Sequence, residues 1–392
     1  MKKRPTEITQ LRLVQPERWQ PIRDDFNFCR LALFVAGDKL PLRFRDIEQK
    51  YIVEINGQKF EALWEVRHDS KLGLPGSFDR DVWLGILEIV NEITEGGRKP
   101  IPVRIHLGSF SEFLKRIGKR SDGGRDIAML KQSIERLATT GCISKRAYNC
   151  PSDGGYLKLG KVFHLISEWG FKGEPHTDGM HESNWITLGE NVRKNLDSGY
   201  IALLDVQYIR QLSGEITKLL IPFLSYRFWL ALQHGRDVYR AHWHDLRDYL
   251  AASGWDKLSR AKQRLKQALQ ELKDSAYIHQ SSDWDGDFYN FRAGDKFIDE
   301  LRNRLDAKEQ YRSWIHGKKS SRQLSLFPMP QQDAKNEQSQ LSDERESILT
   351  RQAIRIAYLS DPPNLSLLAQ HGWTEDDARS LAASLKKRTT AK

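Results

Sequence analysis

The stretch KLSRAKQRLKQALQELK, residues 257–273, decides the fold class, because its apolar residues recur at the spacing of an α-helix. The opposite arc of its helical wheel carries Arg260, Gln263, Arg264 and Gln267. The pattern predicts an amphipathic helix with an outer face of arginine and amide side chains. The apolar residues that should face a core are Leu258, Ala261, Leu265, Ala268, Leu269 and Leu272.

The elements predicted around this helix have the order of a winged helix. A helix near residues 214–232 precedes a short strand around 238–241 and a second helix near Leu246. The long helix follows, and a hairpin with its turn at Asp285 and Gly286 closes the unit. Helix, strand, two helices and a hairpin are the parts of a helix-turn-helix unit with a wing.

The same order of elements is predicted a second time, earlier in the chain. The register can be followed residue by residue, because Ile134, Leu137, Gly141 and Ile143 correspond to Leu269, Leu272, Ala276 and Ile278, all displaced by 135 positions. The earlier elements are a helix from about Asp79 to Glu95, a strand at Ile101–Ile105, a helix containing Phe110–Ile117, a longer helix containing Ile127–Leu137, and a hairpin formed by Cys142–Tyr148 and Tyr156–Ile166.

The chain is therefore predicted to be an α+β protein with tandem winged-helix (helix-turn-helix) domains, a linker and a small C-terminal helical module. Strand and turn signals between Phe26 and Trp64 predict a sheet ahead of the first copy. After Asp299 the composition becomes charged and then Gln-rich, which is typical of a linker. The predicted boundaries are 1–25 for a flexible N-terminal segment, 26–172 for the first domain with its N-terminal strands, 173–300 for the second domain, 301–340 for a charged helix and linker, and 341–392 for the helical module.

The outer faces of the two long helices are the candidate DNA-binding surfaces. Arginine and glutamine match the edges of guanine and adenine in a major groove, while lysine neutralises phosphates. The first copy repeats three of these polar residues at the 135-residue displacement, which core packing does not require. The alternative is that these residues only solvate the outer face of each helix. The candidate DNA-binding residues are Arg125, Lys131, Gln132, Arg136, Lys257, Arg260, Lys262, Gln263, Arg264, Lys266 and Gln267.

The charge of the chain agrees with a polyanionic partner. The formal net charge is +10, the sign expected of a protein that binds nucleic acid. Asp122, Asp126 and Glu135 offset the cations of the first long helix, so we expect the second to dominate affinity for phosphates. Three cysteines form neither a disulfide framework nor metal knuckles. With no apolar leader or membrane-spanning run, these features predict a cytoplasmic protein that does not bind a membrane.

Four short motifs carry a resemblance to a known family: YIRQLS at 208–213, LSYRF at 224–228, LRDYL at 246–250 and RLKQA at 264–268. A tandem winged-helix chain with these motifs resembles bacterial plasmid replication initiators, of the RepA and IncP types. The resemblance covers roughly residues 26–300. It implies recognition of direct repeats in double-stranded origin DNA, opening of an AT-rich segment, and recruitment of a host replicative helicase or initiator. Whether such a chain acts as a monomer or a homodimer stays open.

A pentapeptide near the C-terminus suggests a second partner. Gln323-Leu324-Ser325-Leu326-Phe327 resembles the peptide by which bacterial proteins bind the DNA polymerase sliding clamp. It lies between Lys318-Lys319 and Pro328, where an extended segment can offer its apolar side chains to a pocket. The alternative is that this run packs against its own domain.

Several signals for other functions are weak. His242-Trp243-His244 and Tyr249 suggest a rolling-circle-type nickase, but the repeat places the triplet at the entrance of a helix, where polar residues are ordinary. Asp283, Asp285 and Asp287 mimic a calcium loop, yet the required glycine and glutamate are missing, and a wing turn explains them better. There is no P-loop. We expect no enzyme activity, catalytic residue, metal or cofactor, and a winged-helix transcriptional repressor is the main alternative function.

Overall fold

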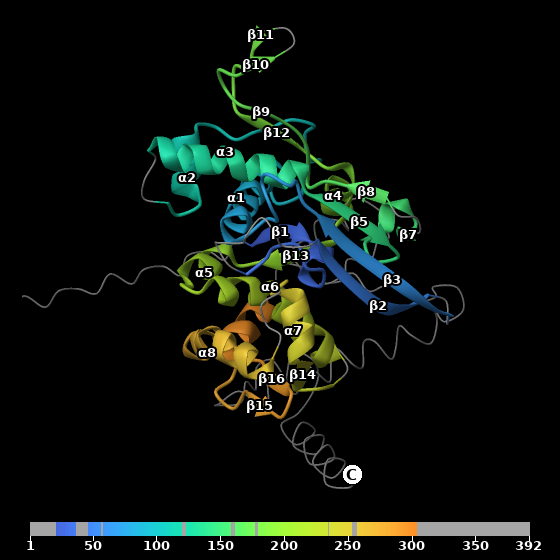
Figure 1. Ribbon diagram of the computed structural model, residues 1–392. Coiled ribbons are helices and arrows are strands. Elements are labelled where there is room, and N and C mark those ends of the chain that lie inside the picture. The colour runs from blue at the N-terminus through green and yellow to red at the C-terminus, as the bar shows by residue number, and fades with distance from the viewer. Residues whose placement is uncertain are drawn as a thin grey trace, which may run out of the picture. The chain divides into compact units, whose positions relative to one another are not determined.

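The computed structural model describes residues 21–36, 46–55, 58–119, 123–157, 161–176, 179–233, 235–252 and 257–303. All of them belong to one compact unit, Met1–Pro330. They form a mixture of helices and small antiparallel sheets (Figure 1). The pentapeptide Gln323–Phe327 and the predicted helical module at 341–392 lie outside the described residues.

Helices and strands are interspersed along the described part of the chain. The helices are η1 (Phe26–Cys29), α1 (Ser77–Ile93), α2 (Phe110–Arg116), α3 (Gly124–Thr139), η2 (Pro151–Asp153), α4 (Glu190–Ser198), α5 (Val206–Gln211), α6 (Glu215–Gln233), α7 (Trp243–Tyr249) and α8 (Leu258–Asp274). The strands are β1 (Ile22–Asp25), β2 (Ile47–Ile55), β3 (Gln58–Arg67), β4 (Ile105–His106), β5 (Gly141–Lys145), β6 (Asn149–Cys150), β7 (Gly155–Tyr156), β8 (Lys161–Phe163), β9 (Ile166–Gly170), β10 (Pro175–His176), β11 (Gly179–Met180), β12 (Trp185–Leu188), β13 (Ile201–Leu204), β14 (Val238–His242), β15 (Asp283–Asp285) and β16 (Phe288–Arg292).

The second predicted copy has the expected elements in the expected order. Helix α6, strand β14, helices α7 and α8, and the β15–β16 hairpin follow one another along the chain. The three strands form an antiparallel sheet of order β14-β16-β15. The hairpin turn includes Gly286, whose φ of 61° is a conformation that glycine adopts without strain. These elements confirm the predicted helices, strand and wing turn.

The first copy has the same order of helices and an equivalent sheet. Helix α1, strand β4 and helices α2 and α3 follow one another, and β4 belongs to a sheet of order β4-β12-β9. In both sheets the strand that precedes the helix pair binds the last strand, which also binds the strand before it. Strands β9 and β12 form the arm that carries β10 and β11 at its tip (Figure 1).

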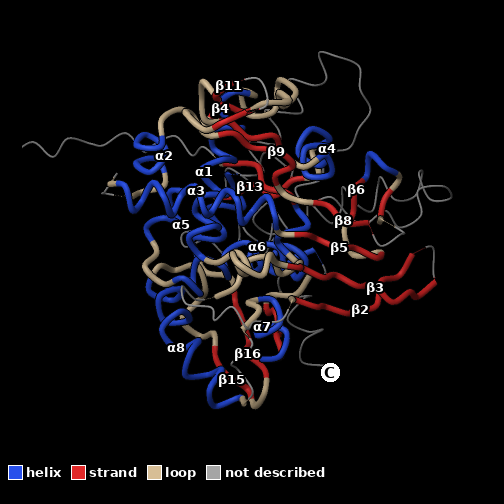
Figure 2. The backbone as a smooth tube through the Cα atoms, turned by 45° about the horizontal axis from the view of Figure 1, so that its top comes forward, coloured by secondary structure: helices blue, strands red, loops and turns tan. Residues whose placement is uncertain are grey.

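The hairpin predicted from Cys142–Tyr148 and Tyr156–Ile166 is confirmed, because β5 pairs with β8 and β6 with β7, but its assignment as the wing of the first copy is wrong. Strand β5 pairs with β3 on one side and with β8 on the other, in a separate sheet of order β2-β3-β5-β8 (Figure 2). Its backbone groups are therefore not available to β4. Strand β4 pairs instead with β12, which comes later in the chain, and the boundary predicted between residues 172 and 173 lies between β9 and β12.

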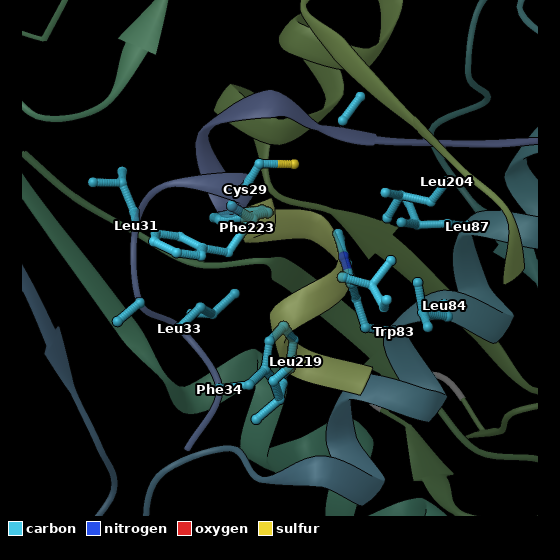
Figure 3. Close-up of a cluster of buried hydrophobic side chains, with 14 of the residues drawn as sticks. Cys29, Leu31, Leu33, Phe34, Trp83, Leu84, Leu87, Leu204, Leu219 and Phe223 are labelled. Carbon is cyan, nitrogen blue, oxygen red and sulfur yellow. The ribbon is translucent and has the colours of Figure 1, made fainter. Parts of the chain in front are cut away.

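Residues 22–36 lie at the centre of the described structure. Strand β1 pairs along its length with the distant β13, and the backbone amides of Val35 and Ala36 donate to the carbonyls of Pro75 and Leu250. Figure 3 shows side chains of this segment packed among residues of α1 and α6 in one buried cluster. The segment thus contacts both the first and the second copy, which share a continuous hydrophobic core.

Candidate nucleic-acid interface

Helix α8 divides its side chains as the sequence predicts. Ala261, Leu265, Ala268, Leu269 and Leu272 are buried, and Leu258 is half-buried against the same core. The exposed side chains are Lys257, Arg260, Gln263, Arg264, Lys266 and Gln267. The predicted outer face is therefore confirmed as a surface, while its contact with DNA stays a prediction.

Positive charge is concentrated in the first part of α8. The helix begins after Lys257, which has extended backbone angles and provides no side-chain cap, and its first turn contains no acidic residue. The acidic residues Glu271 and Asp274 occur only near the C-terminal end. Because the N-terminus of a helix also carries the positive end of its dipole, this end of α8 is suited to bind anionic groups.

Two cations, Lys262 of α8 and Arg240 of β14, contact side chains of the β15–β16 hairpin. The ammonium of Lys262 lies 4.7 Å from the centroid of the Trp284 ring on β15. On the far strand, the guanidinium of Arg240 lies 4.2 Å from the centroid of the Phe288 ring and forms an ion pair of 2.8 Å with Asp285. A cation over an aromatic ring contributes roughly 0.5–1 kcal/mol at exposed sites. Sequence reasoning selected Lys262 but missed Arg240, Trp284 and Phe288, because only strand pairing brings these three together.

The second wing carries acidic residues at its turn. Asp283, Asp285 and Asp287 are exposed around the β15–β16 turn, and the backbone carbonyl of Asp287 accepts from the amide of Trp243. These positions confirm that the three aspartates belong to the predicted wing turn. The wing turn is therefore acidic, whereas the first part of α8 is basic.

Two of the four residues predicted on α3 to bind DNA are cations engaged by other parts of the chain. Arg125 and Gln132 are exposed, as predicted. Lys131 is half-buried, and its ammonium forms an ion pair of 2.6 Å with Glu174 of the arm. The same ammonium lies 5.1 Å from the centroid of the Phe171 ring. The arm therefore neutralises one of the cations that the sequence assigned to DNA.

Arg136 does not face solvent as predicted. Its Nε donates to the carbonyl of Leu72 at 2.8 Å, and its Nη1 donates to Asp79 at 2.6 Å. The side chains of Arg136 and Asp79 are 17% and 3% exposed. A helical wheel places Arg136 near the polar arc, but the N-terminus of α1 covers that position in the folded chain. Its role in the fold is to bind α1.

The residues considered for a nickase have structural roles. His242 is the N-cap of α7, and its Nδ1 accepts from the amide of His244 at 3.3 Å, which confirms the expected helix entrance. Tyr249 is buried, its hydroxyl donates to the carbonyl of Phe28, and burial raises its pKa. A buried phenol of this kind is not accessible to a DNA phosphate. Among the described residues no group of three or more His, Cys, Asp or Glu side chains is placed to hold a metal ion.

Comparisons with known proteins give little further information. No protein-family model matches the chain, and no curated protein matches it. The crystal structure of RctB domains 2-3 aligns with 70% of this chain and 98% of that chain, with 14% identity and a TM-score of 0.37. Within the described ranges, none of the helices is both long and apolar enough to span a membrane.

Proposed function

We propose that this chain is a plasmid replication initiator that binds repeated origin DNA through two winged-helix domains. The observation that carries the proposal is the outer face of α8, where Arg260, Gln263, Arg264 and Gln267 are exposed above a buried apolar stripe. The equivalent sheet orders β4-β12-β9 and β14-β16-β15 support two domains of one kind. The +10 net charge and the four initiator-like motifs also support the proposal.

In the proposed complex, α8 enters a major groove. Arg260 and Arg264 are four residues apart and lie on one side of the helix, so they can donate to guanines in neighbouring base pairs. Gln263 and Gln267 have the same spacing and can bind adenine edges in the same way. Lys257 and its lysine neighbours neutralise the flanking phosphates.

Helix α3 makes the smaller contribution to affinity. Arg125 and Gln132 are available to bind bases, whereas Lys131 is engaged by Glu174 and Arg136 by Asp79. Binding by the second domain should therefore account for most of the salt dependence, because each phosphate contact releases bound counterions. Two domains on consecutive grooves would bend the origin and favour opening of its AT-rich segment.

The initiator would act by recruitment and not by catalysis. The pentapeptide Gln323–Phe327 would bind the sliding clamp and hold it near the origin at a high effective concentration. A host helicase or initiator would supply the unwinding, since the chain has no P-loop and needs no cofactor in this mechanism. The proposed partners are double-stranded origin DNA with direct repeats, the clamp and the helicase.

Substitutions in the two proposed surfaces should separate their functions. Arg260→Ala or Arg264→Ala should weaken binding to a duplex selected by the wild-type chain by about 1–3 kcal/mol per lost bidentate contact, and should relax sequence preference. Leu326→Ala with Phe327→Ala should leave DNA binding unchanged and abolish capture of the sliding clamp in a pull-down. Gln270→Ala is the matched control, because Gln270 is exposed on α8 but bonded to Asp274. Normal clamp capture by the tail variant would contradict the peptide assignment.

Plasmid maintenance distinguishes an initiator from a transcriptional repressor. A plasmid whose only origin is the DNA beside this gene should be maintained when the chain is supplied, and Arg264→Ala should prevent maintenance. Sequence-specific binding without maintenance would instead favour the repressor. Metal-dependent cleavage of single-stranded origin DNA would favour the nickase.

A further inference from the structure

Arg136 connects the last part of α3 to the beginning of α1. One edge of its guanidinium binds the Leu72 carbonyl, and the other binds Oδ1 of Asp79. The second oxygen of Asp79 accepts from the amide of Gly76 at 2.6 Å and so caps the N-terminus of α1. One buried carboxylate thus joins the start of the first helix of this domain to its long helix.

Glu271 makes the equivalent connection in the second domain. Its Oε1 accepts from the amide of Ser213 at 2.5 Å and from the hydroxyl of the same residue at 2.8 Å. Its Oε2 accepts from the amide of Gly214 at 2.9 Å and from the hydroxyl of Thr217 at 2.6 Å. Partial burial acts to raise the pKa of Glu271, but these hydrogen bonds outweigh it and lower the pKa. The carboxylate is therefore ionised at the N-terminus of α6.

The two connections occupy the same position of the repeat. Arg136 and Glu271 are displaced by 135 residues, the displacement that relates the two long helices. The hydroxyl residues four positions later also correspond, because Thr140 donates to the carbonyl of Arg136 and Ser275 donates to that of Glu271. The charge at the position is opposite in the two domains, yet the helices joined are the same. Because residues of opposite charge join the same two helices, the shared feature of the two domains is the position of the long helix and not the charge of the residue that holds it.

We propose that Arg136 and Glu271 are positioning residues, which set the angle at which each long helix meets DNA. The proposal rests on the proposed function, because it concerns the same two helices. Arg125 precedes Arg136 by as many residues as Arg260 precedes Glu271, a length of about 16 Å of helix. A tilt of about 10° at the connection would move the arginine at the far end by about 3 Å, which exceeds the tolerance of a hydrogen bond.

Neutralising the acidic residue of each connection tests the proposal, because electrostatics and a positioning role predict opposite changes in affinity for DNA. Asp79→Asn and Glu271→Gln each remove a negative charge, so simple electrostatics predicts tighter binding to DNA. A positioning role predicts weaker binding to the specific site. The probes are a duplex selected from a random-sequence library by the full-length wild-type chain, and a scrambled duplex of the same length.

We expect both variants to bind the selected duplex about tenfold more weakly than the wild type, the effect of one lost base contact. Binding to the scrambled duplex should be unchanged or tighter. Glu135→Gln and Asp274→Asn are the matched controls, because they neutralise acids on the two long helices, α3 and α8, outside the connections. Both controls should bind the selected duplex at least as tightly as the wild type.

A milder variant guards against loss of folding, which circular dichroism would detect. Thr217→Val removes one of the four hydrogen bonds to Glu271 and leaves the shape of the side chain, so it should weaken specific binding in the same direction. If the wild type selects no sequence from the library, the proposed function fails and the positioning role with it. If the wild type binds but Asp79→Asn, Glu271→Gln and Thr217→Val bind as their controls do, only the positioning role is overturned.

Discussion

At the scale of single residues, Asp25 is a buried carboxyl group whose pKa is strongly changed by the fold. It is buried, and its oxygens accept from Asn27 and Asn195, while Tyr148 donates to it through a short hydrogen bond. Burial raises its pKa from 3.8 to about 7, although these hydrogen bonds act to lower it. The desolvation of a charged carboxylate therefore outweighs three polar neighbours.

The raised pKa of Asp25 predicts a pH dependence of stability. Between 3.8 and about 7 the folded chain keeps a proton that the unfolded chain has lost, so the free energy of unfolding should fall as the pH rises. Below this range the contribution is fully present, and above it the contribution is lost. Urea unfolding of the wild type and of Asp25→Asn, measured from pH 4 to 8, would test this. Equal slopes for the two chains would contradict it, because asparagine has no proton to lose.

Residues differ in how far the sequence alone could place them. The exposure of Arg260 and Arg264 was predictable, because helical spacing and the type of side chain agree. Arg136 was not, because a helical wheel represents one isolated helix and does not contain the α1 residue that binds it. Likewise the pairing of Lys131 with Glu174 depends on where the arm folds back, which local periodicity does not report.

At the scale of elements, helices were easier to predict than strand partners. The spans of α3, α6, α7 and α8 follow from apolar spacing, which is a property of each helix. Alternation also indicates that residues near 142–148 are extended, but it does not name the strand that they pair with. The turn signal at residues 151–155 predicted the pairing of β5 with β8 correctly, but the pairing of β5 with β3 and of β1 with β13 was missed, so the hairpin was assigned to the wrong sheet.

Gly189 shows how tightly one element can approach another. It precedes α4, its amide donates to the carbonyl of Leu165 at 2.8 Å, and a Cβ placed on it would overlap the backbone carbonyl of His164. Gly189→Ala should lower the free energy of unfolding by about 1–3 kcal/mol or more, because the backbone has to move. Gly124→Ala, where a Cβ would contact nothing within 4 Å, should leave stability unchanged or raise it. Denaturant unfolding of both variants measures the difference.

At the scale of the whole molecule, an ion pair between an arginine and a glutamate connects α5 to α1, two helices that are not equivalent in the repeat. Arg210 of α5 donates to both oxygens of Glu88 on α1, at 2.8 and 2.7 Å. Both side chains are mostly buried, at 19% and 13% exposure. The pair therefore joins the first domain to the segment that leads into the second.

Breaking this pair should destabilise the chain measurably. Arg210→Ala should lower the free energy of unfolding by about 1–3 kcal/mol, because the Glu88 carboxylate would lose its charged partner while partly buried. The exposed pair of Lys99 and Glu95 is the control, and Lys99→Ala should cost less than about 1 kcal/mol. A double-mutant cycle with Glu88→Gln would measure the coupling. No coupling between the two residues would contradict the assigned role.

The central position of residues 22–36 has a consequence for synthesis of the protein on the ribosome. Strand β1 can pair with β13 only after the whole first domain has been translated, and Ala36 can bind Leu250 later still. Closing such long loops costs entropy that local contacts do not repay. Residues 22–36 therefore keep their apolar side chains uncovered until the second domain has been synthesised and completes the core.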